Sequence, residues 1–271
     1  MTDESSVMVV LHILKPYVIS DVRCASLVAM ILKNISMDLG LASTLIDQYA
    51  IRLLHDIFKN VNYIKSIVLC NCSIIVMQNL ASCKEYHERI MSEGYFMEVL
   101  LCVASTLNGT HEEKSERGID PHFDEIDVAP ITKAIELVAE TSACHLSLVD
   151  GGIVSTFESL LNQLHDDKKL MSAKTIANIA SSTNCRQNLV NSGAIELIVK
   201  ISAGADIETK SKCTLAIGYL SEYTHTAVTN VSTMLSLVQD VDSASVPGAI
   251  PCVHSVRICI YVCMFVCSAT P

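Results

Sequence analysis

The sequence predicts an all-α fold made of stacked helical repeats, and three observations lead to this prediction. Half of the residues are hydrophobic and only 18% are charged, so the chain can bury a sizeable core. Tryptophan is absent and only 5% of residues are aromatic, which leaves Leu, Ile, Val and Ala to fill a core of closely packed helices. A block of similar sequence also returns after about forty residues, a period typical of helical solenoids.

The repeat is clearest in the second half of the chain. Its two clearest copies are residues 148–180 and 189–220. Gly152 and Gly193 occupy corresponding positions in the two copies, and so do Asn178 and Tyr219. The number of residues between Gly152 and Gly193 equals the number between Asn178 and Tyr219. Because two separate landmarks share one period, the similarity indicates a true structural repeat.

Each block has the composition of three consecutive helices. In the second copy a short first helix ends at Gly193, since glycine adopts the left-handed conformation that closes a helix. A second helix with apolar residues at helical spacing follows over Leu197–Ile201. A polar loop at Gly204–Asp206 then leads into a longer third helix that contains Cys213–Leu220. No block can bury its apolar faces alone, so neighbouring blocks must stack.

These residues resemble the armadillo repeat family. The run Asn188–Val199 is similar to the family's signature for the first and second helices. Ala173–Ala180 is similar to its third-helix signature, with Asn178 at the position that the family fills with asparagine. The resemblance is strongest over residues 140–225. It implies a right-handed armadillo-type α-solenoid, an alpha-alpha superhelix, of about five to six repeats.

Weaker copies align on this asparagine position, which we call the slot. The slot residues are Asn34, Asn79, Leu137, Asn178 and Tyr219. The last two steps between them are equal, whereas the step from Asn79 to Leu137 is the longest. Gly94 occupies the turn position of an earlier repeat, and its separation from Gly152 equals this long step. We interpret the long step as a loop insertion at residues 108–127, between the second and third helices of one repeat.

The sequence thus predicts two regions, a repeat array over residues 1–245 and a tail over residues 246–271. Both end repeats are expected to be incomplete: the first begins at its second helix near Val7–Lys15, and the last starts near Thr226. The tail is apolar and carries Cys252, Cys259, Cys263 and Cys267. Three alternatives are open for this tail. It packs on the last repeat or is disordered, it associates with a membrane or carries an acyl group, or it binds a metal.

The charge of the chain is acidic and uneven. The formal net charge is −10, and residues 111–127 contribute −5 of it, with seven acidic residues against Lys114 and Arg117. We expect a solvated loop in this segment, with a role in partner choice as the alternative. Because phosphate binding requires clustered Lys and Arg, we do not expect the protein to bind nucleic acid.

The cysteines fit a helical core. Eight of the twelve lie within or beside apolar helical patterns: Cys24, Cys70, Cys72, Cys83, Cys102, Cys144, Cys185 and Cys213. The N-terminal stretch Met1–Ser6 is polar and acidic, unlike a secretory signal. We therefore expect reduced thiols that serve as small core residues in a cytoplasmic or nuclear protein.

No catalytic motif stands out in the sequence. It has no Gly-rich phosphate loop followed by Lys-Ser/Thr, no His-Glu-x-x-His and no Gly-x-Ser-x-Gly. Five histidines share no ligand spacing and are expected to be partly exposed on helices: His12, His55, His87, His145 and His165. We therefore expect no catalytic residues, no metal and no other cofactor.

In armadillo proteins the third helices line a concave groove, and the resemblance implies that slot asparagines hydrogen-bond the backbone of an extended peptide there. An Asn amide suits this role because it both donates and accepts. Here the candidates are Asn34, Asn79 and Asn178. Leu137 and Tyr219 depart from the pattern and interrupt the ladder. The alternative is that each Asn bonds only the backbone of its own repeat.

Three lysines are predicted to share this face. Lys133 and Lys174 each lie four residues before a slot position, and Lys212 lies seven residues before Tyr219. The importin-alpha subfamily carries Trp four residues before the slot, and this chain has none, so we do not expect an import receptor for basic signals. We hypothesise a basic strip that attracts an acidic or phosphorylated segment, somewhat as in the catenin branch. The alternatives are ordinary solvated lysines, or coverage of the strip by the chain's own acidic insertion.

The function that the sequence favours is a non-catalytic scaffold or adaptor that binds an extended segment of a partner protein in its groove. The candidate partner-binding residues are Asn34, Asn79, Lys133, Leu137, Lys174, Asn178, Lys212 and Tyr219. Two alternatives remain open: an adaptor attached to a membrane through residues 246–271, and a regulatory subunit of a ligase or kinase assembly.

Overall fold

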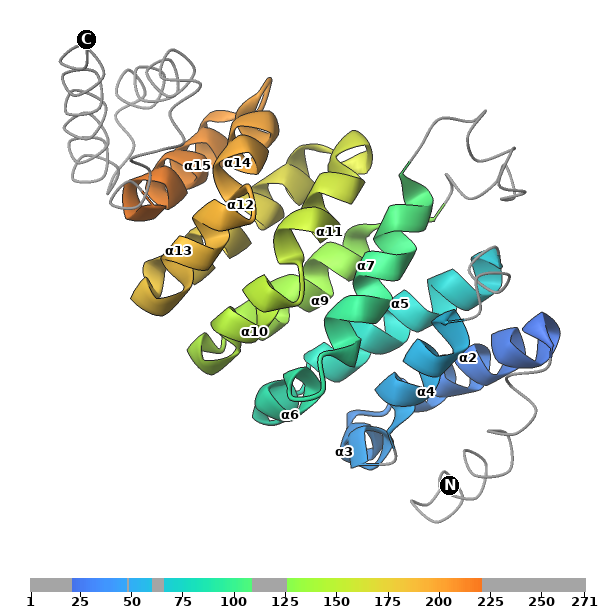
Figure 1. Cartoon of the computed structure of the whole chain (residues 1–271). Coiled ribbons are helices and arrows are strands. Elements are labelled where there is room, and N and C mark those ends of the chain that lie inside the picture. The colour runs from blue at the N-terminus through green and yellow to red at the C-terminus, as the bar shows by residue number, and fades with distance from the viewer. Residues whose placement is uncertain (1–20, 48, 60–65, 109–125, 221–271) are drawn as a thin grey trace, which may run out of the picture. The chain divides into compact units, whose positions relative to one another are not determined.

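The computed structural model describes residues 21–47, 49–59, 66–108 and 126–220, which are α-helical with no β-strand among them (Figure 1). The predicted all-α class is confirmed. Contacts divide these residues into two compact units, of which the first ends at Asn162 and the second begins at Gln163. The C-terminal tail, the predicted partial repeats at both ends and residues 109–125 of the acidic insertion lie outside the described residues.

The described part of the first unit begins with a lone third helix, continues with two full sets of a first, a second and a third helix, and ends with the first two helices of a further set. Their bounds are α2 (Val22–Ser36), α3 (Leu39–Asp47), α4 (Ala50–Phe58), α5 (Ile67–Ala81), η1 (Lys84–Tyr86), α6 (His87–Met91), α7 (Tyr95–Leu107), α9 (Ala129–Ala139), η3 (Ser142–Cys144), α10 (His145–Asp150) and α11 (Ile153–Leu160), with η4 (Leu161–Gln163) at the boundary. This order matches the predicted succession of first, second and third helices, but the third helix α9, with 11 residues, is shorter than the second helix α7, with 13.

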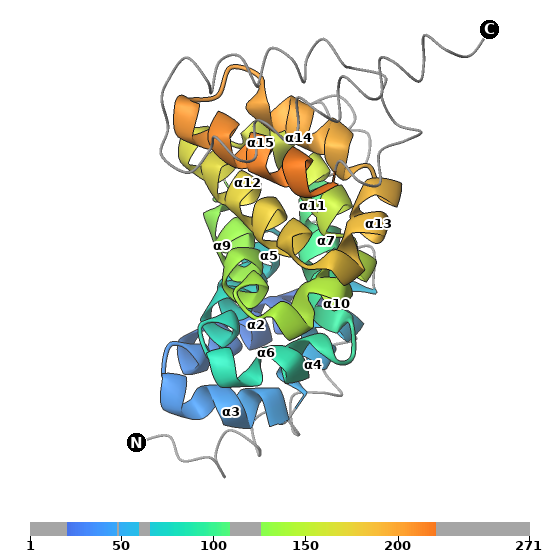
Figure 2. The same cartoon turned by 90° about the vertical axis from the view of Figure 1, so that its left-hand side faces the viewer.

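Two layers of helices enclose the core of the first unit (Figure 2). The third helices α2, α5 and α9 pack side by side, with α5 in the middle. The second helices α4, α7 and α11 pack beside them in the same order, and α7 also contacts α5. Between the layers the side chains of Leu69, Met77 and Phe96 are fully buried. Burial of this apolar surface is the main stabilising contribution in such a fold.

The second unit contains one more set of three helices and the third helix that precedes it. Its helices are α12 (Asp166–Ser181), α13 (Thr183–Asn191), α14 (Ala194–Ser202) and α15 (Ile207–Leu220). The third helices α12 and α15 pack against each other, and both contact α13 and α14. The pairing of consecutive third helices is therefore the same as in the first unit.

Short polar side chains fix where several third helices begin. Asp21 Oδ1 accepts a hydrogen bond from the backbone N–H of Arg23 at 2.9 Å, at the start of α2. Ser66 Oγ accepts from the N–H of Leu69 at 3.3 Å, at the start of α5. At α15, hydrogen bonds from Thr209 hold the pKa of Asp206 below its usual range. These caps satisfy backbone donors that a helix start leaves without partners.

The turn between the first and second helix of each set contains one residue with positive φ. These turn residues are Tyr49, Gly94, Gly152 and Gly193, with φ of 59°, 75°, 86° and 88°. The intervals between them equal the intervals between the first four slot residues, taken in the same order. The glycines are at the predicted positions. Tyr49 was not predicted, because only glycine adopts this conformation without a steric cost.

A second recurring contact joins the ends of the third helices α5, α9 and α12 to the first helix that follows each of them. The donors, which we call joint donors, are His87, His145 and Arg186. Their Nε2, Nε2 and Nε atoms lie 2.7, 2.8 and 2.8 Å from the carbonyl oxygens of Ala81, Ala139 and Ala180, in each case six residues earlier. Each contact gives a hydrogen-bond donor to a carbonyl at a helix end, where no intrahelical partner exists.

The expectation of partly exposed histidines is wrong for His87 and His145, which are both 2% exposed. Because a carbonyl oxygen only accepts hydrogen bonds, Nε2 must carry a proton in both rings. In His87 the other nitrogen, Nδ1, lies 2.8 Å from Thr141 Oγ1. These two side chains are buried because the helix end supplies a partner for them.

Candidate binding surface

The slot residues of the first unit lie on adjacent third helices but in different environments. Asn34 is exposed on α2 and makes no side-chain hydrogen bond with another described residue. Asn79 on α5 and Leu137 on α9 are half-buried. Because α2, α5 and α9 pack in that order, these three residues occupy corresponding positions on neighbouring helices.

Asn79 already has a partner within the protein. Its Nδ2 donates to Ser36 Oγ at 3.0 Å, and Ser36 Oγ donates in turn to the carbonyl of Lys33 at 2.9 Å. Ser36 is fully buried at the end of α2, so this bond links two consecutive third helices. Neither sequence-based alternative described this contact, since the partner is a side chain of the preceding third helix.

Two large apolar side chains stand on the same face of α2 as Asn34. Met30 lies one helical turn before Asn34 and is 44% exposed, and Leu27 lies two turns before it and is 58% exposed. On the opposite side of α2, Val28, Ala29 and other small apolar residues are buried. Clustered exposed apolar side chains typically mark an interaction surface.

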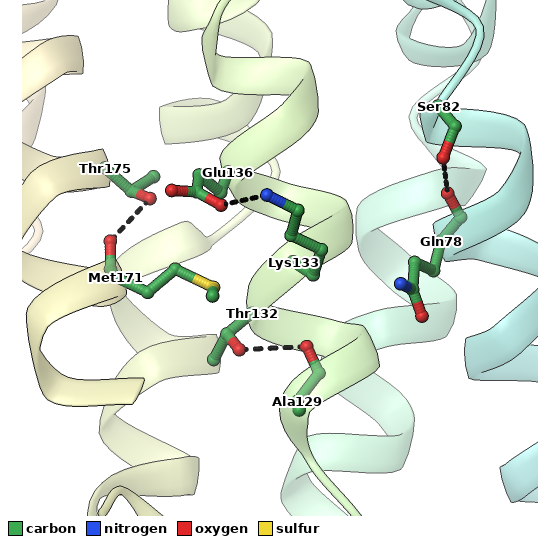
Figure 3. Close-up of polar contacts among 8 residues, drawn as sticks. All are labelled: Gln78, Ser82, Ala129, Thr132, Lys133, Glu136, Met171 and Thr175. Carbon is green, nitrogen blue, oxygen red and sulfur yellow. Dashed lines mark hydrogen bonds and ion pairs between the residues drawn. The ribbon is translucent and has the colours of Figure 1, made fainter. Parts of the chain in front are cut away.

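Lys133 is close to a carboxylate on its own helix. Figure 3 shows its side chain on α9 extending toward Glu136, with Nζ 2.7 Å from Glu136 Oε2. Both side chains are partly exposed, at 41% and 26%. On the neighbouring helix α5, Gln78 accepts a bond from Ser82 through its backbone carbonyl, while its side-chain amide bonds no other described residue (Figure 3). Sequence reasoning missed this amide.

The predicted residues of the second unit lie on α12 and α15. Lys174 on α12 pairs with Glu208 on α15, with 3.0 Å between Nζ and Oε1. Lys212 is half-buried and has no ion pair with another described residue. The predicted basic strip therefore carries less uncompensated charge than its lysines alone suggest, because Glu136 and Glu208 offset Lys133 and Lys174.

The other two predicted residues of this unit differ in their surroundings. Asn178 is exposed on α12. Tyr219 on α15 is half-buried, and the guanidinium carbon of Arg186 lies 5.4 Å from its ring centroid. Since Arg186 also donates to the end of α12, it holds the Tyr219 ring in place. The structure thus brings together Asn34, Asn79, Lys133 and Leu137 in one unit and Lys174, Asn178, Lys212 and Tyr219 in the other.

The cysteines of the described segments behave as core residues. Six of the eight are buried, Cys24 and Cys102 are half-buried, and none of the eight forms a disulfide. Burial raises the pKa of the Cys213 thiol to about 12, and burial together with the nearby Glu88 charge raises the pKa of Cys144 to about 11. Thiols with raised pKa values are poor nucleophiles. Within the described ranges, no group of three or more His, Cys, Asp or Glu side chains could hold a metal ion.

Among residues 21–47, 49–59, 66–108 and 126–220, no single helix is both long and apolar enough to cross a membrane. The segments Ile67–Ala81 and Lys84–Met91 together reach the required length and composition, with a bend of 96° between them. The first of these is α5, which lies between α2 and α9 in the core.

Comparison with known proteins supports the fold. No protein-family model and no curated protein matches the sequence. Among solved structures, the chain is similar to an engineered protein whose crystal structure was determined as a target of the Northeast Structural Genomics Consortium. The TM-score is 0.58 and the sequence identity 16%, over 97% of this chain and 98% of that one. At this identity the similarity concerns the fold alone.

Proposed function

We propose that the protein is a non-catalytic interaction scaffold of the armadillo type, which binds an extended segment of a partner protein along the faces of its third helices. The proposal includes a right-handed solenoid of about five to six repeats. The observation that carries it is the face of α2 in the first unit, where Leu27, Met30 and Asn34 are exposed together. This face combines apolar contact area with an unbonded amide.

An extended peptide fits this combination of groups. Its backbone has N–H and C=O groups that need partners, and the amide of Asn34 offers both a donor and an acceptor. Its side chains could bury against Leu27 and Met30, and such burial contributes about 25 cal/mol per Å² of apolar surface. On α5, the Gln78 amide supplies a further group of the same kind. The binding surface is therefore proposed to mix apolar anchors and amides rather than to form a continuous asparagine ladder.

A matched pair of leucines tests this proposal. Leu27 on α2 and Leu39 at the start of α3 are 58% and 59% exposed, but only Leu27 is on the proposed face. Peptides that bind the full chain would be selected from a random peptide library, and their affinities measured by calorimetry. We expect Leu27→Glu to weaken binding about tenfold or more, as loss of an interface anchor does, and Leu39→Glu to leave it nearly unchanged.

Equal effects of the two substitutions would place the peptide elsewhere and contradict the proposal. So would a selection that yields no binding peptide. Circular dichroism of both variants checks that the substitutions leave the helices folded.

The partner is proposed to carry an acidic or phosphorylated segment that meets the lysines of the predicted strip, which are Lys133 in the first unit and Lys174 and Lys212 in the second. The ion pair between Lys174 and Glu208 allows a test with opposite signs. If the strip attracts an acidic segment, Lys174→Gln weakens binding and Glu208→Gln strengthens it, and both changes shrink as salt is added. Affinity changes of the same sign in both variants, or none, would show that the strip does not contact the partner.

A further inference from the structure

A concave surface also lies away from the third helices, between two turns of the first unit. It is a cleft of about 130 Å³. Its walls are formed by residues around the turn into α4 on one side and around the turn into α7 on the other: Ile46, Tyr49, Ile51 and Arg52, and Arg89, Ile90, Ser92, Glu93 and Tyr95. None of these residues belongs to α2, α5 or α9, so the cleft is separate from the proposed peptide-binding face.

One wall of the cleft contains a residue in a conformation that costs energy. Tyr49 has a φ of 59°, at the turn position that glycine occupies in the following three sets. A non-glycine residue in this region costs roughly 1–2 kcal/mol. The Tyr49 side chain is nevertheless 57% exposed, so burial of its ring does not offset that cost. Strained residues of this kind tend to cluster at binding sites.

The opposite wall is held in position by a stack of side chains. The rings of His55 and Tyr95 are stacked, with centroids 4.4 Å apart, and His55 Nε2 contacts a carboxylate oxygen of Glu98. The Arg52 guanidinium carbon lies 5.9 Å from the Tyr95 centroid. The Tyr95 ring therefore contacts both His55 and Arg52, and its stacking on His55 helps to hold it in position beside the Arg52 guanidinium.

The two arginines of the cleft differ in their charge partners. Arg89 forms an ion pair with Asp47. Arg52 is exposed and contacts the Tyr95 ring, but it has no ion pair or hydrogen bond with another described residue. A planar guanidinium with free N–H groups matches a carboxylate or phosphate group in a bidentate geometry. Arg52 is thus the group of the cleft that is open to an anion.

The size and the remaining charge of the cleft narrow the choice of ligand. Sites for small molecules and cofactors typically have volumes of about 300–1,000 Å³, so this cleft suits a single side chain. Glu93 also lines it, and a carboxylate there repels a doubly charged phosphate more strongly than a singly charged carboxylate. Tyrosine and arginine, which contribute to its walls, are among the residue types enriched at the centres of protein interfaces.

We infer that this cleft is a second binding site of the protein, which takes one Asp or Glu side chain of a partner protein, with Arg52 as the anion-binding group and Tyr49 and Tyr95 as its walls. The site lies on the second-helix side of the first unit. It does not depend on the proposed peptide-binding face.

The test uses the full chain and a fluorescent peptide of alternating Gly and Glu, with a Gly and Gln peptide as its neutral counterpart. We expect the Glu peptide to bind more tightly, and to shift the side-chain Nε–H signal of Arg52 in NMR spectra. Arg52→Gln is expected to weaken binding of the Glu peptide about fivefold or more. The control Lys84→Gln, with the same change in charge at a position outside the cleft, is expected to have little effect.

A second variant keeps the test independent of folding. Tyr49→Asn removes a wall of the cleft, but asparagine tolerates positive φ, so we expect weaker binding of the Glu peptide with no drop in melting temperature.

Equal binding of the Glu and Gln peptides, or equal effects of Arg52→Gln and Lys84→Gln, would overturn the inference. Tighter binding of a phosphoserine peptide would overturn the preference for a carboxylate. A large gain in affinity on replacing residues 109–125 with a Gly-Ser linker would assign the cleft to the chain's own acidic segment instead of a partner.

Discussion

The first set of helices, α3 to α5, differs from the sets that follow it at two positions where the fold otherwise repeats. Its turn residue is Tyr49, where the later sets have Gly94, Gly152 and Gly193. Ala42 precedes Tyr49 by the same interval as His87 precedes Gly94, so it occupies the position of the joint donors, but it has no side-chain donor. The same backbone conformation is thus compatible with different side chains. A residue that departs from the repeat, such as Tyr49, is therefore a candidate for a role other than stabilising the fold.

The joint donors offer the largest effect with which to test this comparison. His145→Ala removes a buried hydrogen bond to the Ala139 carbonyl and leaves a cavity, and we expect it to lower the free energy of unfolding by about 3 kcal/mol. The measurement is denaturant unfolding of the full chain. His145→Gln retains an N–H donor at a similar distance from the backbone and should recover part of the loss. If His145→Ala costs less than about 1 kcal/mol, the joint contact is not a stabilising feature and Ala42 is no exception.

The corner before α11 is the tightest of the turns and gives the next largest effect. A Cβ atom added at Gly151 would lie 2.7 Å from Met97 Cβ and 2.9 Å from the carbonyl oxygen of Ser147. We expect Gly151→Ala to cost about 2 kcal/mol, since α7 or the corner must shift to accept it. Thermal unfolding provides the measurement, and an unchanged melting temperature would show that the two elements can separate without cost.

Gly94 isolates the cost of the turn conformation itself. A Cβ at Gly94 would have no atom within 4 Å, and φ is 75°. The substitution Gly94→Ala therefore adds conformational strain without a clash, and we expect a loss of about 1 kcal/mol in denaturant unfolding. A loss as large as that of Gly151→Ala would mean that the turn has a steric constraint beyond its dihedral angle.

Tyr49 should show the smallest effect, with the opposite sign. Replacing it with Asn relieves part of the strain at φ of 59° and exposes little apolar surface, because the ring is already 57% exposed. We expect Tyr49→Asn to stabilise the protein by about 0.5 kcal/mol, measured by thermal unfolding alongside Gly94→Ala. A clear destabilisation would indicate that the Tyr49 ring stabilises the fold. The turn residue of the first set would then have a structural role, like the turn glycines of the later sets.

The sequence predicted the features that recur with the same residue type. Gly94, Gly152 and Gly193 and the asparagines of the slot share their chemistry, so their spacing indicated the three-helix period. Tyr49, at the same spacing, was missed because it departs from the residue type that the turn favours. His87, His145 and Arg186 were missed for a related reason: a carbonyl needs only a donor, and the chain meets that need with two different side chains.

Side-chain contacts between different helices could not be predicted from the sequence, because they depend on how the helices pack. Helical periodicity placed Lys174 on a face of its helix, but its pairing with Glu208 depends on how α12 and α15 are packed. The bond between Asn79 and Ser36 similarly joins residues that are far apart in the sequence, on α5 and α2. The walls of the cleft also come from two turns that meet only in the folded unit, and Arg52 and Arg89 carry no motif that marks them.

The bond from Asn79 to Ser36 gives a structural cost to a ligand that competes for the same N–H group. A peptide whose backbone accepts this particular Nδ2–H of Asn79 displaces the Ser36 hydroxyl, which ties α5 to the end of α2. Occupancy and helix spacing would then be thermodynamically linked, so that whatever tightens the α2–α5 contact lowers affinity, and ligand binding loosens that contact in return. Tension along the chain would then alter ligand affinity at this point, and faster amide exchange at the end of α2 would report that the ligand is bound.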